Sequence, residues 1–396
     1  MTSNTNDDVV IVGAARTPFG KLLGAFATLQ ATELGSHAIR AALTQGGVPA
    51  DEVEAVIMGQ VLQAGVGQNP AKQAALGAGI ARSAHTSTVN KVCLSGLTAV
   101  IDAARLVRSG EATVVVAGGM ESMTNAPHLL PKTRSGVKFG GFEALDHMEY
   151  DGLREAQQGI SMGVLTEQHD SDYPTTREEQ DHVAALSHQR ALAATHDGTL
   201  AREISPVTVR SRRGEVTVET DEGIREGVTE ESLANLRPAF SSDGTITAGN
   251  SSPITDGAAA VVVTTRQHAA QQGWTVLATL RAVGQVAGPD ASLQAQPANA
   301  LEAALKRQGW DAHKLDLIEI NEAFGAVVAH SMRQLGVSED VVNPHGGAIA
   351  MGHPIGASGA RLVVHAAHQI AAGHATTAGV ALCGGGGQGE ALLMET

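Results

Sequence analysis

The chain has 396 residues, a formal net charge of −14 and an aromatic content of only 3%. An excess of negative charge repels a phosphate backbone and a scarcity of aromatic rings leaves few platforms for stacked bases, so we expect no nucleic-acid partner. No apolar run approaches the roughly 18 residues that a membrane-spanning helix needs, so we expect no membrane partner either.

Short apolar runs rich in β-branched residues recur along the chain and predict buried central strands at 8–13, 55–58, 113–116, 260–263, 317–320 and 379–382. Alanine-rich stretches with helical spacing lie between these runs and predict helices at 31–43, 96–107, 299–308 and 359–372. Alternation of strands and helices is typical of the α/β class.

Two segments resemble each other at a constant offset of 263 residues (358 − 95), namely 95–104 and 358–367. Five positions are identical, and each predicted helix is followed by an apolar strand that runs into two glycines. The matching order of helix, strand and Gly-Gly predicts a duplicated domain.

The region between the two copies has more charge and more turn signals, together with an amphipathic pattern at 177–194. We therefore predict an N-terminal half made of residues 1–123 and 249–273, an inserted loop domain at 124–248, and a C-terminal half at 274–396. The length agrees with two or three structural units.

The chain has two cysteines and no apolar run near its first residue, which favours a reducing, cytoplasmic setting with free thiols over a disulfide. Cys93 stands just before a predicted helix, where unpaired N–H groups and the helix dipole favour a thiolate. That is a setting for a nucleophile, although a lone cysteine is more often a small buried apolar residue.

His353 precedes a proline between glycine-rich turns, so its imidazole is held in a tight loop, where it can act as a base toward a thiol or serve a structural role. His345 lies near His353 in the sequence, also beside turn glycines, and could be mistaken for the base. Cys383 ends a predicted strand and is followed by four glycines, 384–387, whose N–H groups can converge on an oxyanion. Together these side chains suggest acyl transfer through a thioester.

Other kinds of site fit the sequence poorly. The glycine run lacks the Lys-Ser/Thr ending of a phosphate loop, and the glycine near residue 13 lacks the dinucleotide spacing. The cysteines have no short-spaced partners of the zinc type, so no metal site is predicted, and no Gly-x-Ser-x-Gly elbow supports a serine hydrolase.

Basic residues are frequent in the middle of the chain and offer local positive charge to an anionic ligand, although solvated loops explain them equally well. They are Lys132, Arg134, Lys138, Arg210, Arg212, Arg213 and Arg225.

Four segments together resemble the catalytic segments of the thiolase family, and the resemblance extends over nearly the whole chain. The segments are Asn90-Lys91-Val92-Cys93-Leu94-Ser95-Gly96, Asn321-Glu322-Ala323-Phe324, Gly352-His353-Pro354-Ile355-Gly356-Ala357-Ser358-Gly359 and Cys383-Gly384-Gly385-Gly386. Within that family, the inserted-lobe segments 135–138 and 221–225 are most similar to the acetyl-CoA acetyltransferase branch.

The resemblance implies a duplicated fold of five α-β-α-β-α layers with a loop domain over the active site, and a homotetramer built as a dimer of dimers. It implies that Cys93 carries the acyl group, that His353 takes the thiol proton and that Cys383 exchanges the α-proton of acetyl-CoA. Asn321 would hold a water that stabilises an enolate with His353, and the main-chain N–H groups of Cys93 and Gly385 would stabilise the other oxyanion.

The same resemblance implies that Arg225 and Ser252 contact coenzyme A, which is a substrate, and that no cofactor is tightly bound. The expected activity is reversible condensation of two acetyl-CoA to acetoacetyl-CoA and CoA, or thiolysis of a 3-ketoacyl-CoA. Two thiols suit this chemistry because one must hold the acyl electrophile while the other removes a proton beside a thioester carbonyl.

Three alternatives remain open. Departures from the short-chain biosynthetic pattern allow a thiolase of β-oxidation with broader chain length. They lie at Leu94, Ser161, Pro344-His345 and the longer 288–297 segment. A decarboxylating ketoacyl synthase would use a Cys-His-His set, against which Asn321 and Cys383 weigh. A catalytically silent acyl-CoA-binding or scaffolding protein is the alternative from another class.

Overall fold

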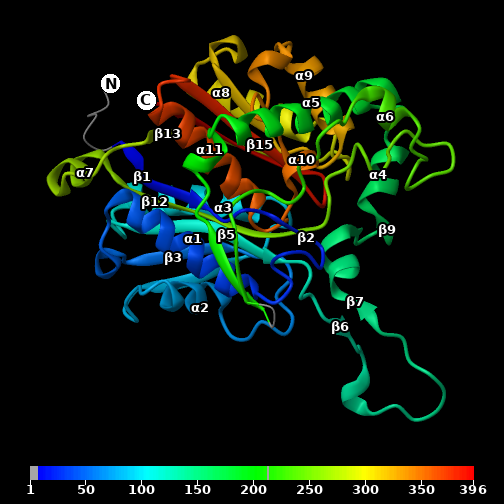
Figure 1. Ribbon diagram of the computed structural model, residues 1–396, viewed down its shortest axis with the longest axis horizontal. Coiled ribbons are helices and arrows are strands. Elements are labelled where there is room, and N and C mark those ends of the chain that lie inside the picture. The colour runs from blue at the N-terminus through cyan, green and yellow to red at the C-terminus, as the bar shows by residue number, and fades with distance from the viewer. Residues whose placement is uncertain (1–7, 212–213) are drawn as a thin grey trace.

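The computed structural model describes residues 8–211 and 214–396 and is a mixed α/β fold organised around one long path of paired strands (Figure 1). The strand order is β14-β15-β16-β13-β1-β12-β5-β3-β4, with β2 beside β12. The strands of this path are β1 (Val9–Arg16), β2 (Gly20–Lys21), β3 (Ala55–Gly59), β4 (His85–Val89), β5 (Val115–Ser122), β12 (Thr255–Thr265), β13 (Ala278–Ala287), β14 (Leu317–Ile320), β15 (Thr377–Gly384) and β16 (Gln388–Glu395).

The strand path is palindromic about its middle. Outward from β1 come β12, β5 and β3, and outward from β13 come β16, β15 and β14. In both directions the first two pairings are antiparallel and the third is parallel. Only two residue pairs, Val10↔Thr279 and Ile11↔Ala278, join β1 to β13. The path is thus two sheets of the same topology that meet at a narrow seam, which confirms the duplicated fold.

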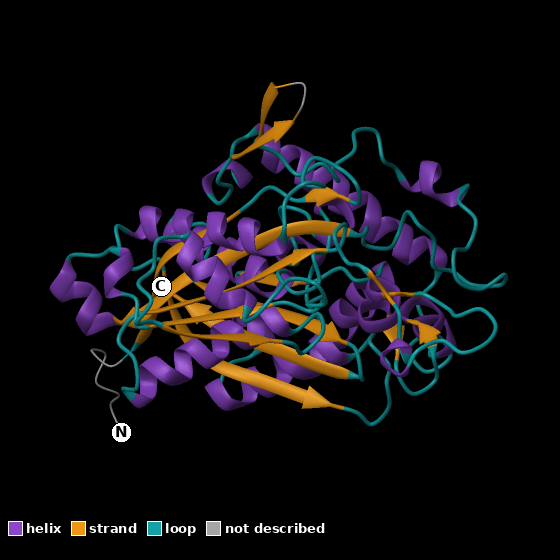
Figure 2. Cartoon of the chain, turned by 90° about the horizontal axis from the view of Figure 1, so that it is seen from below, coloured by secondary structure: helices purple, strands orange, loops and turns teal. Residues whose placement is uncertain are grey.

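Helices cover both faces of each sheet and give the five predicted layers (Figures 1 and 2). Helices α1 (Ala31–Gly46) and α2 (Pro70–Gly77) cover the outer face of the first sheet, and α8 (Gln296–Gln308) and α9 (Gly325–Leu335) that of the second. Helices α3 (Ser95–Ser109) and α11 (Ser358–Ala371) form the middle layer.

Alternation along the strands divides the apolar side chains between these layers. Val9 and Ile11 of β1 belong to the central cluster with α3 and α11, whereas Val10 and Val12 belong to the cluster under α1 and α2. Successive residues of a strand point to opposite faces of its sheet. A continuous run of β-branched residues in the sequence is therefore a strand buried on both faces.

The two middle helices contact each other through glycines at matching positions of the repeat. A Cβ on Gly96 of α3 would lie 2.8 Å from the main-chain nitrogen of Ala360, and one on Gly359 of α11 would lie 2.5 Å from that of Leu97. The two contacts are equivalent in the repeat, because Gly96 corresponds to Gly359 and Leu97 corresponds to Ala360 at the offset of 263 residues. Because the contact is near both helix N-termini, it brings together the loops that precede the helices, and these loops carry Cys93 and His353.

A long segment between β5 and β12 forms a separate lobe, which overlaps the predicted insertion at 124–248; the exact domain boundaries stay a prediction. Its elements are β6 (His128–Leu129), η3 (Thr133–Ser135), β7 (Leu145–Asp146), η4 (Met148–Leu153), β8 (Arg154–Glu155), β9 (Ile160–Ser161), α4 (Met162–Gln168), α5 (Arg177–His196), η5 (Leu200–Arg202), β10 (Val207–Ser211), β11 (Gly214–Val218) and α6 (Glu230–Ala234). The remaining short helices are η2 (Ala50–Glu52), α7 (Arg266–Gln272), η6 (Ala312–Lys314), η7 (Glu339–Val341) and α10 (Ala348–Met351).

Buried charge attaches the lobe to the first sheet. The Arg16 guanidinium at the end of β1 donates to Glu203 at 2.6 Å and to both carboxylate oxygens of Asp221 at 2.7 and 2.9 Å, and all three side chains are fully buried. His365 of α11 is 2.7 Å from the other oxygen of Glu203. A buried carboxylate needs such partners because burial alone disfavours its charge.

On the outer side of the lobe, His182 of α5 bridges two glutamates. Its Nδ1 is 2.6 Å from Glu230 of α6 and its Nε2 is 2.9 Å from Glu339 of η7. Hydrogen bonds to Glu230 and then to Glu339 raise the pKa of His182.

An arm formed by β6, η3 and β7 projects from the body (Figure 1). None of the helices in residues 8–211 and 214–396 combines the length and the apolarity required to cross a bilayer.

Candidate active site

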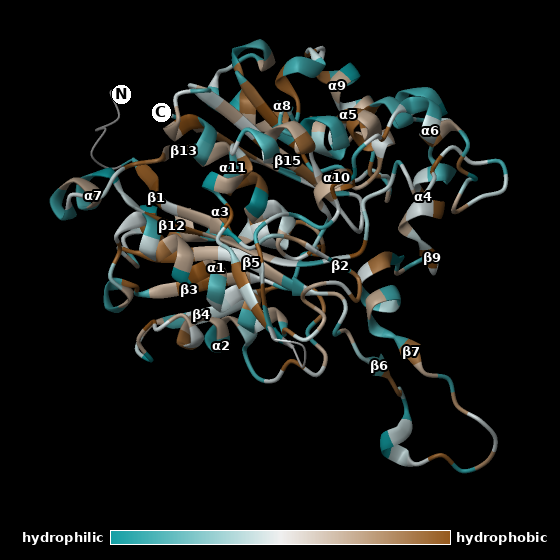
Figure 3. Cartoon of the chain, viewed as in Figure 1, coloured by the Kyte–Doolittle hydropathy of each residue, from teal (hydrophilic) through white to brown (hydrophobic). Residues whose placement is uncertain are grey.

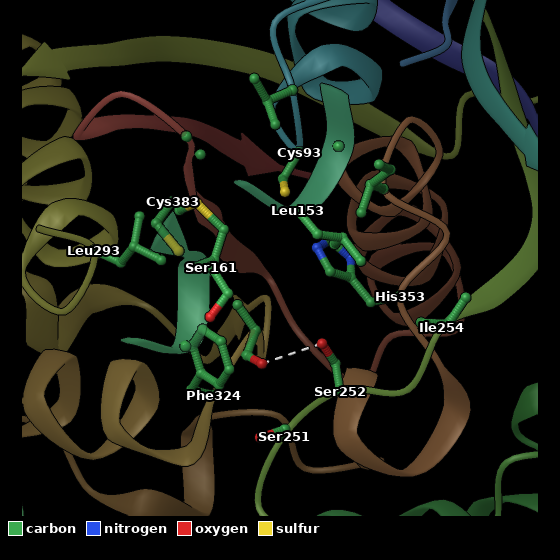
Figure 4. Close-up of a pocket in the computed structure, with 18 of the residues that line it drawn as sticks. Cys93, Leu153, Ser161, Ser251, Ser252, Ile254, Leu293, Phe324, His353 and Cys383 are labelled. Carbon is green, nitrogen blue, oxygen red and sulfur yellow. Dashed lines mark hydrogen bonds between the residues drawn. The ribbon is translucent and has the colours of Figure 1, made fainter. Parts of the chain in front are cut away.

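A cavity of about 310 Å³ lies where the loops before α3 and α11 meet the end of β15. Cys93, His353, Cys383, Gly385 and Ser252 all line it. Figure 4 shows both cysteine sulfurs and the His353 ring around the same open space. Residues more than 250 positions apart in the chain thus meet as the sequence predicted.

Cys93 follows a strained turn. The residue before it, Val92, has a φ of 52°, which a β-branched residue rarely adopts. Hydrogen bonds hold this conformation: the Val92 N–H donates to Asn90 at 3.0 Å, and the Ser95 hydroxyl donates to the Val92 carbonyl at 2.6 Å and accepts the Lys91 N–H at 2.8 Å. The local strain is maintained by these bonds and presents Cys93 to the cavity.

The Cys93 thiol is protonated in the resting site. Burial raises its pKa to about 12, and the negative charge of Glu121 adds to the rise. This direction is opposite to the one that the helix N-terminus led us to expect, because loss of hydration disfavours the thiolate. A nucleophilic Cys93 needs a base at the moment of attack.

His353 is held in the form of such a base. Its Nδ1 lies 2.6 Å from Ser358 Oγ, and the Ser358 hydroxyl donates to the Pro354 carbonyl at 3.1 Å. We assign the Ser358 hydroxyl proton to the Pro354 carbonyl, which makes Ser358 the acceptor of Nδ1–H and leaves the lone pair on Nε2. Nε2 is buried and has no partner, while burial lowers the pKa of His353 to about 4 and keeps the ring neutral.

Two further contacts fix the loop that carries His353. The His353 N–H donates to Thr255 Oγ1 at 3.0 Å. The buried Glu121 carboxylate accepts the N–H groups of Val61, Leu62 and Gly356 at 3.0, 3.1 and 2.9 Å, and so connects this loop to the loop after β3. Burial raises the pKa of Glu121 to about 7.

Cys383 is the second thiol of the cavity. Burial raises the pKa of Cys383, and its coupling to the neighbouring Cys93 thiol raises the pKa further, which places the two sulfurs within electrostatic reach of each other. The chain continues into a hairpin turn with positive φ at Gly386 and Gly387, before β16. A Cβ on Gly384 would lie 2.6 Å from the Leu94 side chain, so only glycine allows Cys383 to approach the Cys93 loop this closely.

Asn321 does not line the cavity but follows β14, with its N–H donating to the Ala381 carbonyl at 3.0 Å. Its side chain is buried and its Nδ2 has no partner in the structure. A buried amide donor without an acceptor is costly, so this group is available to a water or a ligand oxygen. The neighbouring Glu322 accepts hydrogen bonds from Ser187 at 2.6 Å and from Asn343 at 3.0 Å, which fixes the segment.

Ser252 lies at the mouth of the cavity, where its hydroxyl donates to the Ala323 carbonyl at 3.1 Å (Figure 4). Arg225 lines a second cleft of about 420 Å³ that shares Ser251, Pro253 and Ile254 with the cavity. Arg225 is thus beside the cavity and not in it.

Of the other basic residues of the middle region, those that the structure describes do not line this cavity. Arg210 lies on the β10–β11 hairpin and pairs with Glu215, and Lys132, Arg134 and Lys138 belong to the arm. Arg212 and Arg213 lie outside the described residues. His345 is 3.0 Å from His365 and does not line the cavity, in agreement with its treatment as a decoy.

Sequence reasoning missed the residues that hold the reactive groups in place: Ser358, Thr255 and Glu121. Ser358 had a signal, because it directly precedes the helix predicted at 359–372 and lies five positions after the histidine. The other two contact the His353 loop from about 100 and 230 positions away, and their sequence neighbourhoods read as ordinary strand ends.

The arrangement combines two protonated thiols, a neutral imidazole with a free lone pair, and a glycine-rich turn. No group of three or more side chains in the described ranges could hold a metal ion. Such a set can hold an acyl group on one sulfur and move protons through the imidazole and the other sulfur.

Comparison with known proteins gave consistent matches. The model described as "Thiolase, N-terminal domain" matches residues 9–267, and "Thiolase, C-terminal domain" matches residues 274–396. A "Probable acetyl-CoA acetyltransferase" of Mycolicibacterium smegmatis is 53% identical over 387 residues, which are 98% of this chain and 100% of that protein. An "Acetyl-CoA acetyltransferase" of Cupriavidus necator is 46% identical over 390 residues, with 98% and 99% of the two chains covered.

A solved structure is equally similar in fold. The crystal structure of the Bacillus anthracis acetyl-CoA acetyltransferase superposes with a TM-score of 0.95 at 36% identity, covering 99% of this chain and 100% of that one.

Proposed function

The chain belongs to the thiolase family, and from this premise we propose that it is an acyl-CoA C-acetyltransferase that interconverts two acetyl-CoA with acetoacetyl-CoA and CoA. The observation that carries the proposal is the meeting of two thiols and an unpartnered imidazole nitrogen at one cavity. The two relatives described above carry the names "Probable acetyl-CoA acetyltransferase" and "Acetyl-CoA acetyltransferase", and this chain matches each of them over nearly its full length.

In the first half-reaction, Cys93 Sγ attacks the thioester carbonyl of acetyl-CoA while His353 Nε2 takes the thiol proton. The tetrahedral oxyanion lies near the main-chain N–H groups of Cys93 and Gly385. When it collapses, the bond to the CoA sulfur breaks and Cys383 gives its proton to the departing thiolate. The products are acetyl-Cys93, CoA, protonated His353 and the Cys383 thiolate.

In the second half-reaction, the Cys383 thiolate removes an α-proton from a second acetyl-CoA. Protonated His353 and a water held by Asn321 stabilise the enolate oxygen. The enolate carbon then attacks the acetyl carbonyl, the bond to Cys93 breaks, and His353 returns its proton to that sulfur. All three groups finish as they began, so the cycle balances without a cofactor; CoA takes part only as substrate and product.

A thiolase with broader chain length is the second candidate, and the lining of the cavity favours it. The wall is largely apolar and includes Leu153, Ile254, Phe324 and Leu293, the last of which comes from the longer 288–297 segment. Burial of each additional methylene group against apolar walls of this kind is favourable by about 0.8 kcal/mol.

The test is thiolysis of 3-ketoacyl-CoAs of graded length with free CoA, together with mass spectrometry of the acyl-enzyme. We expect Cys93→Ser to carry no acyl adduct on its peptide, and Cys383→Ser to become acylated from acetyl-CoA but to condense very slowly. Unaltered condensation by Cys383→Ser would remove Cys383 from the mechanism. Absence of any adduct on the wild-type protein would instead support a silent acyl-CoA-binding role.

We further propose a homotetramer assembled as a dimer of dimers, with the arm as a contact. Four large apolar side chains of the arm are exposed, namely Leu130, Val137, Phe139 and Phe142, with Phe139 at 102%. Figure 3 colours parts of the arm as hydrophobic. Exposed apolar clusters of this kind mark interaction surfaces. Analytical ultracentrifugation of the double variant Phe139→Ser/Phe142→Ser should show dimers, and an unchanged tetramer would contradict this role of the arm.

We place this activity in the cytoplasm because both cysteines are free and share one cavity, so the chemistry needs a reducing compartment. Fractionation of cells that produce the protein tests the location.

A further inference from the structure

A second cleft continues the catalytic cavity toward the surface. It has a volume of about 420 Å³, shares Ser251, Pro253 and Ile254 with the cavity, and is also lined by Lys21 and Arg225. An elongated ligand with its thioester at Cys93 therefore has a path from the sulfur past these three residues into the second cleft.

The two cations of this cleft have no carboxylate partner within residues 8–211 and 214–396. No ion pair of the described structure includes Lys21 or Arg225, and both side chains are exposed. Glu226 directly follows Arg225 but forms no ion pair with it in the described structure, and Glu222 accepts the main-chain N–H groups of Lys21 and Ala25 at 2.9 and 3.0 Å. In a chain with 41 acidic and 27 basic residues, two unpaired cations in one cleft favour an anionic ligand.

His188 of α5 lies behind Arg225 and is almost fully buried. The Arg225 main-chain N–H is 3.2 Å from Nδ1, and the Arg225 guanidinium is 3.2 Å from Nε2. A neutral imidazole has only one acceptor nitrogen, whereas both Arg225 groups are donors. His188 can therefore accept from only one of them, and it orients the arginine without neutralising it.

The protonation state of His188 agrees with this geometry. Burial, followed by the charges of Arg225 and Lys21, lowers the pKa of His188 to about 4. The imidazole is neutral near pH 7, so the guanidinium keeps its full charge and most of its five N–H donors for a ligand.

We propose that Lys21, together with Arg225, binds the phosphate groups of the coenzyme A thioester, and that the buried His188 is a positioning residue that sets the direction of the Arg225 guanidinium. This inference rests on the proposed function and adds Lys21 and His188 to it. Arginine suits bidentate binding of a phosphate and lysine adds a point charge.

The test compares a full substrate with one that lacks phosphates, acetoacetyl-CoA and acetoacetyl-N-acetylcysteamine. Lys21→Ala should raise the KM for acetoacetyl-CoA by roughly 2- to 10-fold, the range expected for one net hydrogen bond, and leave kcat nearly constant. The KM for the truncated thioester should not move. Lys306→Ala, an exposed lysine of α8, is the matched control and should leave both KM values unchanged.

Two substitutions test His188 itself. His188→Leu removes the acceptor at similar volume and should raise the KM for acetoacetyl-CoA only, whereas His188→Gln keeps an acceptor and should restore most of the affinity. If turnover of the truncated thioester is too slow to measure, mass spectrometry can follow acylation of Cys93 by each of the two thioesters. The acylation yields then give the same comparison between the full and the truncated substrate.

The possible outcomes are distinct. If His188→Leu lowers kcat equally for both substrates, its role is structural and the positioning assignment is overturned. If Lys21→Ala shifts both KM values alike, or neither, Lys21 does not bind phosphate. If the wild-type protein is acylated by neither substrate, the proposed function fails and this inference fails with it.

Discussion

Replacement of Ser358 by alanine tests whether the His353 tautomer is set by a single hydroxyl. In Ser358→Ala, a proton on Nδ1 loses its acceptor in a buried site, at a cost of about 1–3 kcal/mol. The ring avoids this cost by moving the proton to Nε2, because His353 lines the cavity and a water that enters the cavity can accept an Nε2–H. That tautomer presents an N–H and not a lone pair to Cys93.

The active tautomer must then be regained in every turnover at the same cost. Since about 1.36 kcal/mol corresponds to a factor of ten in rate, kcat should fall by roughly 5- to 150-fold with little change in KM. Steady-state thiolysis of acetoacetyl-CoA measures kcat, and single-turnover acylation of Cys93 shows whether the loss is in the first half-reaction.

Ser36→Ala is the matched control, because Ser36 is a buried helix serine whose hydroxyl donates to the Thr32 carbonyl, far from the cavity. It should leave kcat unchanged. A Ser358→Ala enzyme with wild-type kcat and wild-type acylation would refute the assignment of the ring proton to Nδ1 by Ser358.

Three further predictions concern stability. Gly359→Ala places a Cβ 2.5 Å from a main-chain nitrogen and should lower the free energy of unfolding, measured by urea titration, by about 1–3 kcal/mol. The control Gly141→Ala, whose Cβ would have no atom within 4 Å, should change this free energy by less than about 0.5 kcal/mol. Equal effects of the two substitutions would contradict the close helix crossing. His182 has a raised pKa, so the stability from its two glutamate contacts is complete below the unfolded pKa of about 6.5 and is lost as pH rises through the folded pKa; a His182→Ala variant whose unfolding midpoint keeps the wild-type pH dependence would exclude this contribution. Arg16→Ala leaves two buried carboxylates without their cation and should cost about 3–5 kcal/mol by calorimetry, and a change below about 1 kcal/mol would show that the network adds little.

Much of the fold could be predicted because the sequence carries local signals for it. The run at 317–320 became β14 (Leu317–Ile320), and the helix predicted at 31–43 became α1 (Ala31–Gly46). Both elements are buried on the expected faces, where residue type and spacing alone decide the structure. The strand order could not be obtained this way, because pairing depends on contacts between distant segments.

The reactive groups were also predictable, but their environment was not. Cys93, Cys383 and His353 carry chemistry in their side chains and stand beside glycines, so they are visible in the sequence. Whether the Cys93 thiol is ionised depends on how much water the folded cavity admits, and burial reversed that prediction. The contact of Glu121 with Gly356 joins segments 235 positions apart, which no local pattern reports.

The paired glycines at the crossing of α3 and α11 have a consequence for how this protein can change over time. Cys93 lies just before α3 and His353 lies just before α11, so the helix contact sets the distance between nucleophile and base. A displacement of one helix relative to the other would therefore increase that distance. A larger residue in place of Gly96 or Gly359 would force the two helices apart and so move Cys93 away from His353. Substitutions are therefore tolerated less well at Gly96 and Gly359 than at positions of the two halves that lie far from this contact.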